Sequence, residues 1–142
     1  MSIRRIPNNI FSIIQKNIPL SCVDAILINK KNEFLSVKRS IPPYKNKWCL
    51  PGGIIKRNQK ILDKLDEIGK KELGIKFESV KPIGFYEKIY PNRHDITHCF
   101  LVKASSYDLK LDHQASVGKF FKKIPNNTSI FHAKMLKDAG FS

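Results

Sequence analysis

Two charged residues lie in segments that otherwise have the pattern of sheet strands. Asp24 interrupts the apolar run Cys22–Ile28, and a carboxylate taken out of water is costly unless it has a partner or a purpose. Arg39 ends the next strand-like segment, and its planar guanidinium can hold a phosphate through a rigid fork of donors. Both residues are therefore candidates for a functional site. The alternative for Asp24 is an edge or hydrogen-bonded strand residue with no role in chemistry.

A glycine pair and a carboxylate form a second group. Leu50-Pro51-Gly52-Gly53 stops a short strand, and Lys70-Lys71-Glu72-Leu73-Gly74-Ile75 follows about twenty residues later. The spacing of the apolar residues between them predicts one helix from Asn58 to Leu73, with Asn58 as its N-cap. Gly69 weakens the interior of such a helix by about 1 kcal/mol relative to Ala. Gly74 suits the left-handed conformation that ends a helix.

The composition indicates one globular domain with a strong positive charge. The chain has 142 residues, of which 42% are hydrophobic, and its formal net charge is +14. This length suits a single domain with its own core. The charge attracts polyanions, but the lysines are scattered along the chain, which is typical of a solvated surface. We therefore expect an anionic small-molecule substrate and regard nucleic acid as the less favoured partner.

The sequence lacks the features of membrane insertion and of disulfide bonding. No apolar run reaches the ~20 residues that span a bilayer, and the first nine residues lead into no signal-peptide pattern. We therefore expect a cytoplasmic protein with no membrane partner. Cys22, Cys49 and Cys99 each lie in an apolar strand-like run, so we expect buried free thiols.

The remaining elements follow from hydrophobic periodicity. We expect helices at 10–18 and 128–139, with His132 on the surface of the second. We expect strands at 22–28, 33–39, 47–50, 77–90, 96–102 and 118–121, with a kink near Pro82 and Gly84. Because strands and helices neither alternate strictly nor segregate, this order predicts a mixed α/β sandwich.

Taken in order, these motifs resemble a Nudix hydrolase over essentially the whole chain. Within that superfamily the chain is most similar to the GDP-mannose mannosyl hydrolase group. The similarity is carried by segments 19–24, 32–39, 48–53 and 111–114. The resemblance implies the Nudix fold, a mixed β-sheet sandwiched between α-helices. It also implies a single Nudix domain over 1–142, with the Nudix box at 53–75, and a homodimer.

The Nudix box departs from its consensus, G-x5-E-x7-R-E-U-x-E-E-x-G-U, where U is apolar. Gln59, Ile68 and Lys71 stand where the consensus has acids, and Glu67 stands where it has arginine. Of the four consensus acids, only Glu72 is retained. The group that this chain resembles also lacks some of the consensus residues of the box.

The resemblance implies one metal site. The carbonyl of Gly53, the carboxylate of Glu72 and the amide oxygen of Gln114 would hold Mg²⁺, with Mn²⁺ as a substitute. Mg²⁺ is usually bound through one or two carboxylates together with water and substrate phosphate. A diphosphate could therefore complete the coordination shell.

The resemblance also implies roles around the substrate. Arg39 would clamp phosphate and Asp24 would orient the sugar or base, so that Asp24, Arg39 and Glu72 form the catalytic set. Lys88, in the loop before Pro91, would replace positive charge that the box has lost. His94, in the polar turn 91–95, would supply a mobile acid or base, unless it is only a solvated surface group.

One position separates two functional hypotheses. Where the resembled group has its general base, a histidine directly after the distal glutamine, this chain has Ala115. The first hypothesis is an Mg²⁺-dependent Nudix hydrolase acting on a nucleoside diphosphate linked to another moiety, such as the nucleotide sugar GDP-mannose. The second is a Nudix domain that binds a nucleotide, a nucleotide sugar or RNA without hydrolysing it.

Overall fold

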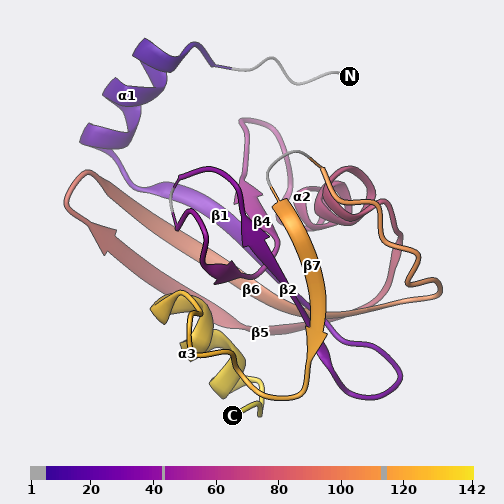
Figure 1. Ribbon diagram of the computed structural model, residues 1–142. Helices are drawn as coiled ribbons and strands as arrows, with labels where there is room; N and C mark the ends of the chain where they lie inside the picture. Colours follow the sequence, from indigo (N-terminus) through magenta and orange to yellow (C-terminus); the bar gives the residue numbers. More distant parts are fainter. Residues whose placement is uncertain (1–5, 43, 113–114) are drawn as a thin grey trace.

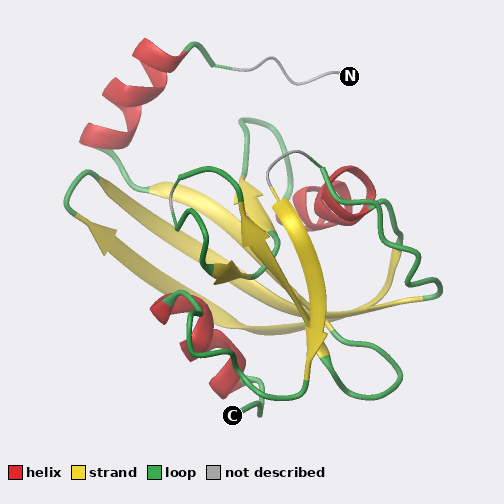
Figure 2. Cartoon of the chain, in the orientation of Figure 1, coloured by secondary structure: helices red, strands yellow, loops and turns green. Residues whose placement is uncertain are grey.

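The computed structural model describes residues 6–42, 44–112 and 115–142. The strands are β1 (Leu20–Leu27), β2 (Phe34–Arg39), β3 (Trp48–Cys49), β4 (Gly52–Ile54), β5 (Phe77–Tyr90), β6 (Arg93–Ala104) and β7 (Ala115–Phe121). The helices are α1 (Asn8–Asn17), α2 (Ile61–Glu67), the π-helix η1 (Ile68–Leu73) and α3 (Ile130–Asp138). Figure 2 shows strands at the centre of the molecule and helices around them.

The strands form two sheets, which together confirm the predicted mixed α/β architecture. One sheet has the order β4-β1-β6-β5, and the other has the order β3-β2-β7. β1 runs parallel to β6 and antiparallel to β4. The long hairpin of β5 and β6 changes register between Pro82 and Gly84, which confirms the predicted kink.

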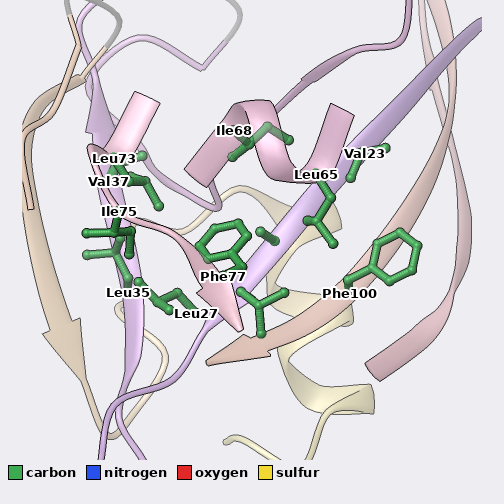
Figure 3. Packing of buried hydrophobic residues seen from close by; sticks show 12 residues of the cluster. Val23, Leu27, Leu35, Val37, Leu65, Ile68, Leu73, Ile75, Phe77 and Phe100 are labelled. Atoms are coloured by element: carbon green, nitrogen blue, oxygen red, sulfur yellow. The ribbon is translucent and has the colours of Figure 1, made fainter. Parts of the chain in front are cut away.

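The two faces of β1 carry two separate parts of the core. Val23, Ala25 and Leu27 point to the cluster under α2 and η1, whereas Ile26 packs in the cluster with Met135 and Leu136 of α3. This alternation follows from the two-residue period of a strand. Figure 1 shows α2 and α3 on opposite sides of the sheet that contains β1, and Figure 3 shows Leu65 and Ile68 packed with Phe77 in the first cluster. Asp24 therefore belongs to the α3 face.

The helix predicted from Asn58 to Leu73 differs from the observed one. Asn58 has a φ of 66°, so it lies in a left-handed turn and the prediction that it caps the helix is wrong. The α-helix begins at Ile61 and becomes a π-helix at Ile68. A Cβ at Gly69 would lie 2.9 Å from the carbonyl oxygen of Ile75. Gly69 therefore allows the end of the helix to pack closely on the strand that follows, which outweighs its low helix propensity.

Other local predictions are confirmed. Gly74 ends the π-helix with a φ of 68°, and the three cysteines are buried and free. In Figure 1, α1 projects from the body, and none of its residues is buried. Among the residues described, no helix combines the length and the apolar character needed to cross a membrane.

Candidate active site

A small pocket lies where β2, β4, η1 and β7 approach one another. Its wall includes Arg39, Gly52, Glu72, Asp112 and Ala115. Strand pairing fixes the first and last of these, because Arg39 lies opposite Ala115 in the β2–β7 ladder. The pocket therefore contains two of the three residues predicted to be catalytic.

Glu72 is the half-buried acid of this pocket. It lies in the last turn of η1, and its carbonyl oxygen accepts a hydrogen bond from the N–H of Asp112 at 3.1 Å. Burial and the charge of Asp112 raise the pKa of Glu72 to about 8, against the opposing effect of Lys64. A carboxyl group in this state exchanges a proton near neutral pH.

Arg39 is held in place by the loop that follows β2. Its Nε donates to the carbonyl oxygen of Ile41 at 3.2 Å, and its Nη2 donates to that of Pro42 at 3.1 Å. These bonds orient one edge of the guanidinium. The positive charge of Arg39 also acts on Glu72, so the two groups face the same space.

Lys64 lies beside Glu72, although the sequence analysis did not select it. A Cβ at Gly53 would lie 3.0 Å from Nζ of Lys64 and 3.7 Å from Oε1 of Glu72. Lys64 is only 6% exposed, and its Nζ lies 3.4 Å from Oε1 of Glu67. The missing side chain of Gly53 thus leaves room for a buried ammonium group next to the pocket carboxylate.

Asp24 lies in a second buried cluster, on the opposite face of β1. Its Oδ2 lies 2.9 Å from Nζ of Lys88 and 2.9 Å from Nε2 of His132. The N–H of Leu50 donates to Nδ1 of His132 at 3.3 Å. This bond assigns the proton of a neutral ring to Nε2, which then donates to Asp24. The buried carboxylate therefore has two direct partners.

The electrostatics of this cluster follow from these contacts. Burial opposes ionisation of Asp24, but Lys88 and His132 outweigh it and hold the pKa of Asp24 below its ordinary value. The pKa of Lys88 is raised, because attraction to Asp24 outweighs burial. Burial and the charge of Lys88 lower the pKa of His132. The cluster is therefore a carboxylate–ammonium pair with a neutral histidine.

Two sequence-based expectations about this region are wrong. His132 is 5% exposed and not on the surface, because it occupies the face of α3 that also carries Met135 and Leu136. Lys88 lies inside β5 and not in a loop, and its ammonium is engaged with Asp24. Neither residue lies in the wall of the Glu72 pocket.

His94 lies away from both clusters. It belongs to β6 and not to a turn, because the hairpin turn is shorter than the polar segment suggests. Its Nε2 lies 3.3 Å from Oε2 of Glu87, and Glu87 lines a larger, mainly apolar hollow between β5 and α3. The structure does not bring His94 to Glu72, and its role in substrate binding stays a prediction.

The comparison with protein families shows which family the chain belongs to. The NUDIX domain family matches residues 19–122. The chain belongs to the Nudix family. The matched segment contains Arg39, the glycine pair, the box helix and Glu72, so the pocket is lined by residues of the matched domain.

Individual Nudix relatives are distant in sequence. The low-salt glycan biosynthesis protein Agl8 of Haloferax volcanii is 26% identical over 126 residues, which are 83% of this chain and 80% of the relative. The ADP-ribose pyrophosphatase of Methanocaldococcus jannaschii is 28% identical over 84% of this chain and 72% of its own length. Together with the family match, the pyrophosphatase supports a hydrolase.

Solved structures show the same fold. The MutT NUDIX hydrolase from Burkholderia pseudomallei superposes with a TM-score of 0.80 at 19% identity and covers 86% of this chain and 98% of its own. The NUDIX domain of Shewanella oneidensis NrtR, complexed with ADP ribose, gives a TM-score of 0.73 at 18% identity and 87% coverage of both chains. The predicted Nudix fold is therefore confirmed.

The Nudix box of this chain fits a divalent cation poorly. Nudix hydrolases generally use divalent metals such as Mg²⁺, but within 6–42, 44–112 and 115–142 no three His, Cys, Asp or Glu side chains gather as a metal site. Ile68 is buried in the core, and an ammonium group of Lys64 lies next to Gly53 and Glu72. The third predicted ligand, Gln114, lies outside the described residues.

Proposed function

We propose that this Nudix domain, spanning residues 1–142, hydrolyses a nucleoside diphosphate linked to another moiety, in the chemical class of the nucleotide sugars. The family match and the names of two relatives support this class. ADP-ribose is a nucleoside diphosphate joined to a sugar, and the name of the Haloferax protein refers to glycan synthesis. GDP-mannose, suggested by the sequence resemblance, is the first candidate substrate to test beside ADP-ribose.

One observation carries the proposal: the cationic Arg39 and the half-buried acid Glu72 line the same pocket. Arg39 would bind a phosphate oxygen, because part of its donor set is already oriented by the loop carbonyls and its charge points to the pocket. Glu72 lines the same pocket. The surrounding positive charge of the chain, +14, favours approach of an anionic substrate.

Glu72 would take the proton of the attacking water. Its pKa of about 8 suits a general base near neutral pH, where the best catalytic groups titrate close to the working pH. Ala115 lines the same pocket but offers no group that can accept a proton. Glu72 would thus replace the histidine base of the resembled group.

The Mg²⁺ dependence predicted from the resemblance stays a separate prediction. In that prediction, the carbonyl of Gly53, the carboxylate of Glu72 and the amide of Gln114 hold the cation. A carboxylate that holds Mg²⁺ is a much weaker base, because the cation stabilises its ionised form. Metal dependence and proton transfer are therefore competing roles for Glu72, and the pH profile of turnover separates them.

The test is turnover of ADP-ribose, GDP-mannose and other nucleoside diphosphate sugars, with Mg²⁺ and with EDTA. We expect the rate to rise with pH through about 8 and to fall ~10²-fold or more in Glu72→Gln. Glu78→Gln, which changes an exposed acid of β5, should leave the rate unchanged. Turnover that does not depend on Glu72 would remove the pocket from the reaction.

A second function, binding without hydrolysis, is favoured by Ala115. The pocket wall at this position is a methyl group, so the resembled group's base is missing from the place where that group needs it. Calorimetry with the same compounds tests this function. Affinity that depends on Arg39, with no turnover at any pH between 6 and 10, would support it.

A further inference from the structure

Lys64 lies on the apolar face of its helix. Lys64 shares the buried face of α2 and η1 with Ile61, Leu65 and Ile68, at the spacing of one helical face. Lysine is almost never fully buried unless its charge is paired. A lysine on this face therefore needs a reason in the electrostatics of its surroundings.

The head group of Lys64 lies between two acids. Its Nζ lies 3.4 Å from Oε1 of Glu67, and Glu67 is itself held by a hydrogen bond from the side chain of Gln59. On the other side, the same ammonium approaches Gly53 and acts on the charge of Glu72. Gln59 and Glu67 are two of the positions that depart from the Nudix consensus. Together, these two departures from the consensus form a binding position for the ammonium group of Lys64.

The geometry points to Lys64 as a resident cation of the Nudix site. We propose that the Lys64 ammonium takes the place of the divalent ion beside Glu72 and Gly53. The site would then not take up Mg²⁺ or Mn²⁺, and it would bind a nucleoside diphosphate without a metal. Binding of a nucleoside diphosphate without a metal rests on the proposed function, whereas the exclusion of Mg²⁺ and Mn²⁺ does not.

Electrostatic repulsion is the physical basis. A divalent ion bound by Glu72 and the carbonyl of Gly53 would lie a few ångströms from Nζ of Lys64. At such separations, even with the dielectric constant of water, repulsion between charges of +2 and +1 weakens binding by about tenfold or more. The buried position of Lys64 increases this effect, because less solvent screens the two charges.

The metal arm of the test uses Mn²⁺ alone as the probe. Free Mn²⁺ is followed by electron paramagnetic resonance during titration of the full chain. The native chain should show no Glu72-dependent binding, whereas Lys64→Met should bind Mn²⁺ at least about tenfold more tightly, with the gain abolished by adding Glu72→Gln. Tight, Glu72-dependent binding by the native chain would overturn the proposal.

Two controls separate the position of the charge from its amount. Lys64→Arg keeps a cation on the same face and should behave like the native chain. Lys71→Met removes an equal charge from an exposed neighbour and should gain much less affinity than Lys64→Met. Equal gains in the two methionine variants would show a general charge effect and contradict the proposal. Thermal unfolding checks that each variant is folded.

The ligand arm uses ADP-ribose and calorimetry. The native chain should bind it equally well, within about twofold, in EDTA and in Mg²⁺, while Lys64→Met should lose affinity about tenfold in EDTA. Binding by the native chain only when Mg²⁺ is present would overturn the proposal. No binding of any nucleoside diphosphate derivative under either condition would instead remove the proposed function, and the Mn²⁺ result would still stand.

Discussion

A buried lysine lies near an acid on each side of the Gly52-Gly53 strand. The pKa values of the two acids are shifted in opposite directions. On the α3 side, Lys88 contacts Asp24 directly at 2.9 Å, and the pKa of Asp24 is lowered. On the α2 side, Lys64 contacts Glu67 instead, and the pKa of Glu72 is raised to about 8. The shifts differ because Asp24 contacts its lysine directly, whereas Lys64 forms its ion pair with Glu67 and not with Glu72.

This difference suggests that the two acids have different roles, one in folding and one in binding or proton transfer. An acid with direct ionic and hydrogen-bonding partners is committed to the folded structure, and removing one partner leaves a buried charge behind. An acid that is buried beside a second acid, Asp112, is costly for the fold and available for a proton or a ligand. Asp24 therefore supports the pocket from behind Gly52, and Glu72 lies in the pocket wall, where we propose that it acts.

The largest expected effect comes from breaking the first pair. Lys88→Met should lower the free energy of unfolding by about 3–5 kcal/mol, because Asp24 stays buried without its cation. Lys70→Met is a matched control, since Lys70 lies 2.8 Å from Asp66 but both side chains are exposed; it should cost less than about 1 kcal/mol. Urea denaturation at pH 7 measures both. Similar losses would contradict the assignment of Lys88–Asp24 as the critical pair.

Alanine substitutions at the two neighbouring glycines should lower stability by different amounts, because each glycine contacts a different one of the two regions. A Cβ at Gly52 would meet Oδ1 of Asp24 at 1.9 Å and the backbone oxygen of Val23 at 2.6 Å, whereas a Cβ at Gly53 meets the flexible end of Lys64. We expect Gly52→Ala to cost about 3 kcal/mol and Gly53→Ala about 1 kcal/mol or less. Thermal unfolding compares them. Equal costs would show that Lys64 cannot move aside.

Replacing Glu72, on the α2 side of the strand, by glutamine should stabilise the protein. The pKa of Glu72 is higher in the folded state than its ordinary value of about 4.3. Its contribution to stability is therefore present at low pH and is lost as the pH rises to about 8. Glu72→Gln removes this loss, so it should stabilise the protein by roughly 1–3 kcal/mol above pH 8 and by little near pH 4.

The pH dependence of the Asp24 region has the opposite sign. The pKa of Asp24 and that of His132 are lowered in the folded state, so their contributions are present at neutral pH and are lost as the pH falls below about 6.5 and then about 4. Denaturation curves between pH 4 and 9 separate the two regions. A stabilising effect of Glu72→Gln that did not grow with pH would contradict this account.

The sequence predicted the elements better than the contacts between them. The apolar runs at 22–28 and 96–102 identified two strands of the larger sheet, and glycine chemistry predicted the end of the box helix at Gly74. The contact of His132 with Asp24 spans 108 residues, and no local pattern encodes such a pairing. The predicted cap at Asn58 failed because a left-handed turn precedes the helix.

A usable signal for the missed site residues was nevertheless present. Lys64 stands three residues after Ile61, one before Leu65 and four before Ile68, which places a charge on the apolar face of its helix. His132 has the same relation to Met135 and Leu136 in α3. Polar groups on an apolar helical face indicate a buried partner. What the spacing alone could not provide is the identity of that partner, which depends on how the sheets pack.

The smallest expected effect is the coupling between Lys64 and Glu72. A double-mutant cycle with Lys64→Met and Glu72→Gln measures the part of the stability that depends on both residues. At pH 9, where Glu72 is ionised, the coupling should be about 1 kcal/mol, since the two charges are near but not in contact. At pH 5, where Glu72 in the folded state is protonated, the coupling should be close to zero. A coupling that persists at pH 5 would mean that Lys64 acts through packing, and the resident-cation assignment would then lose its electrostatic basis.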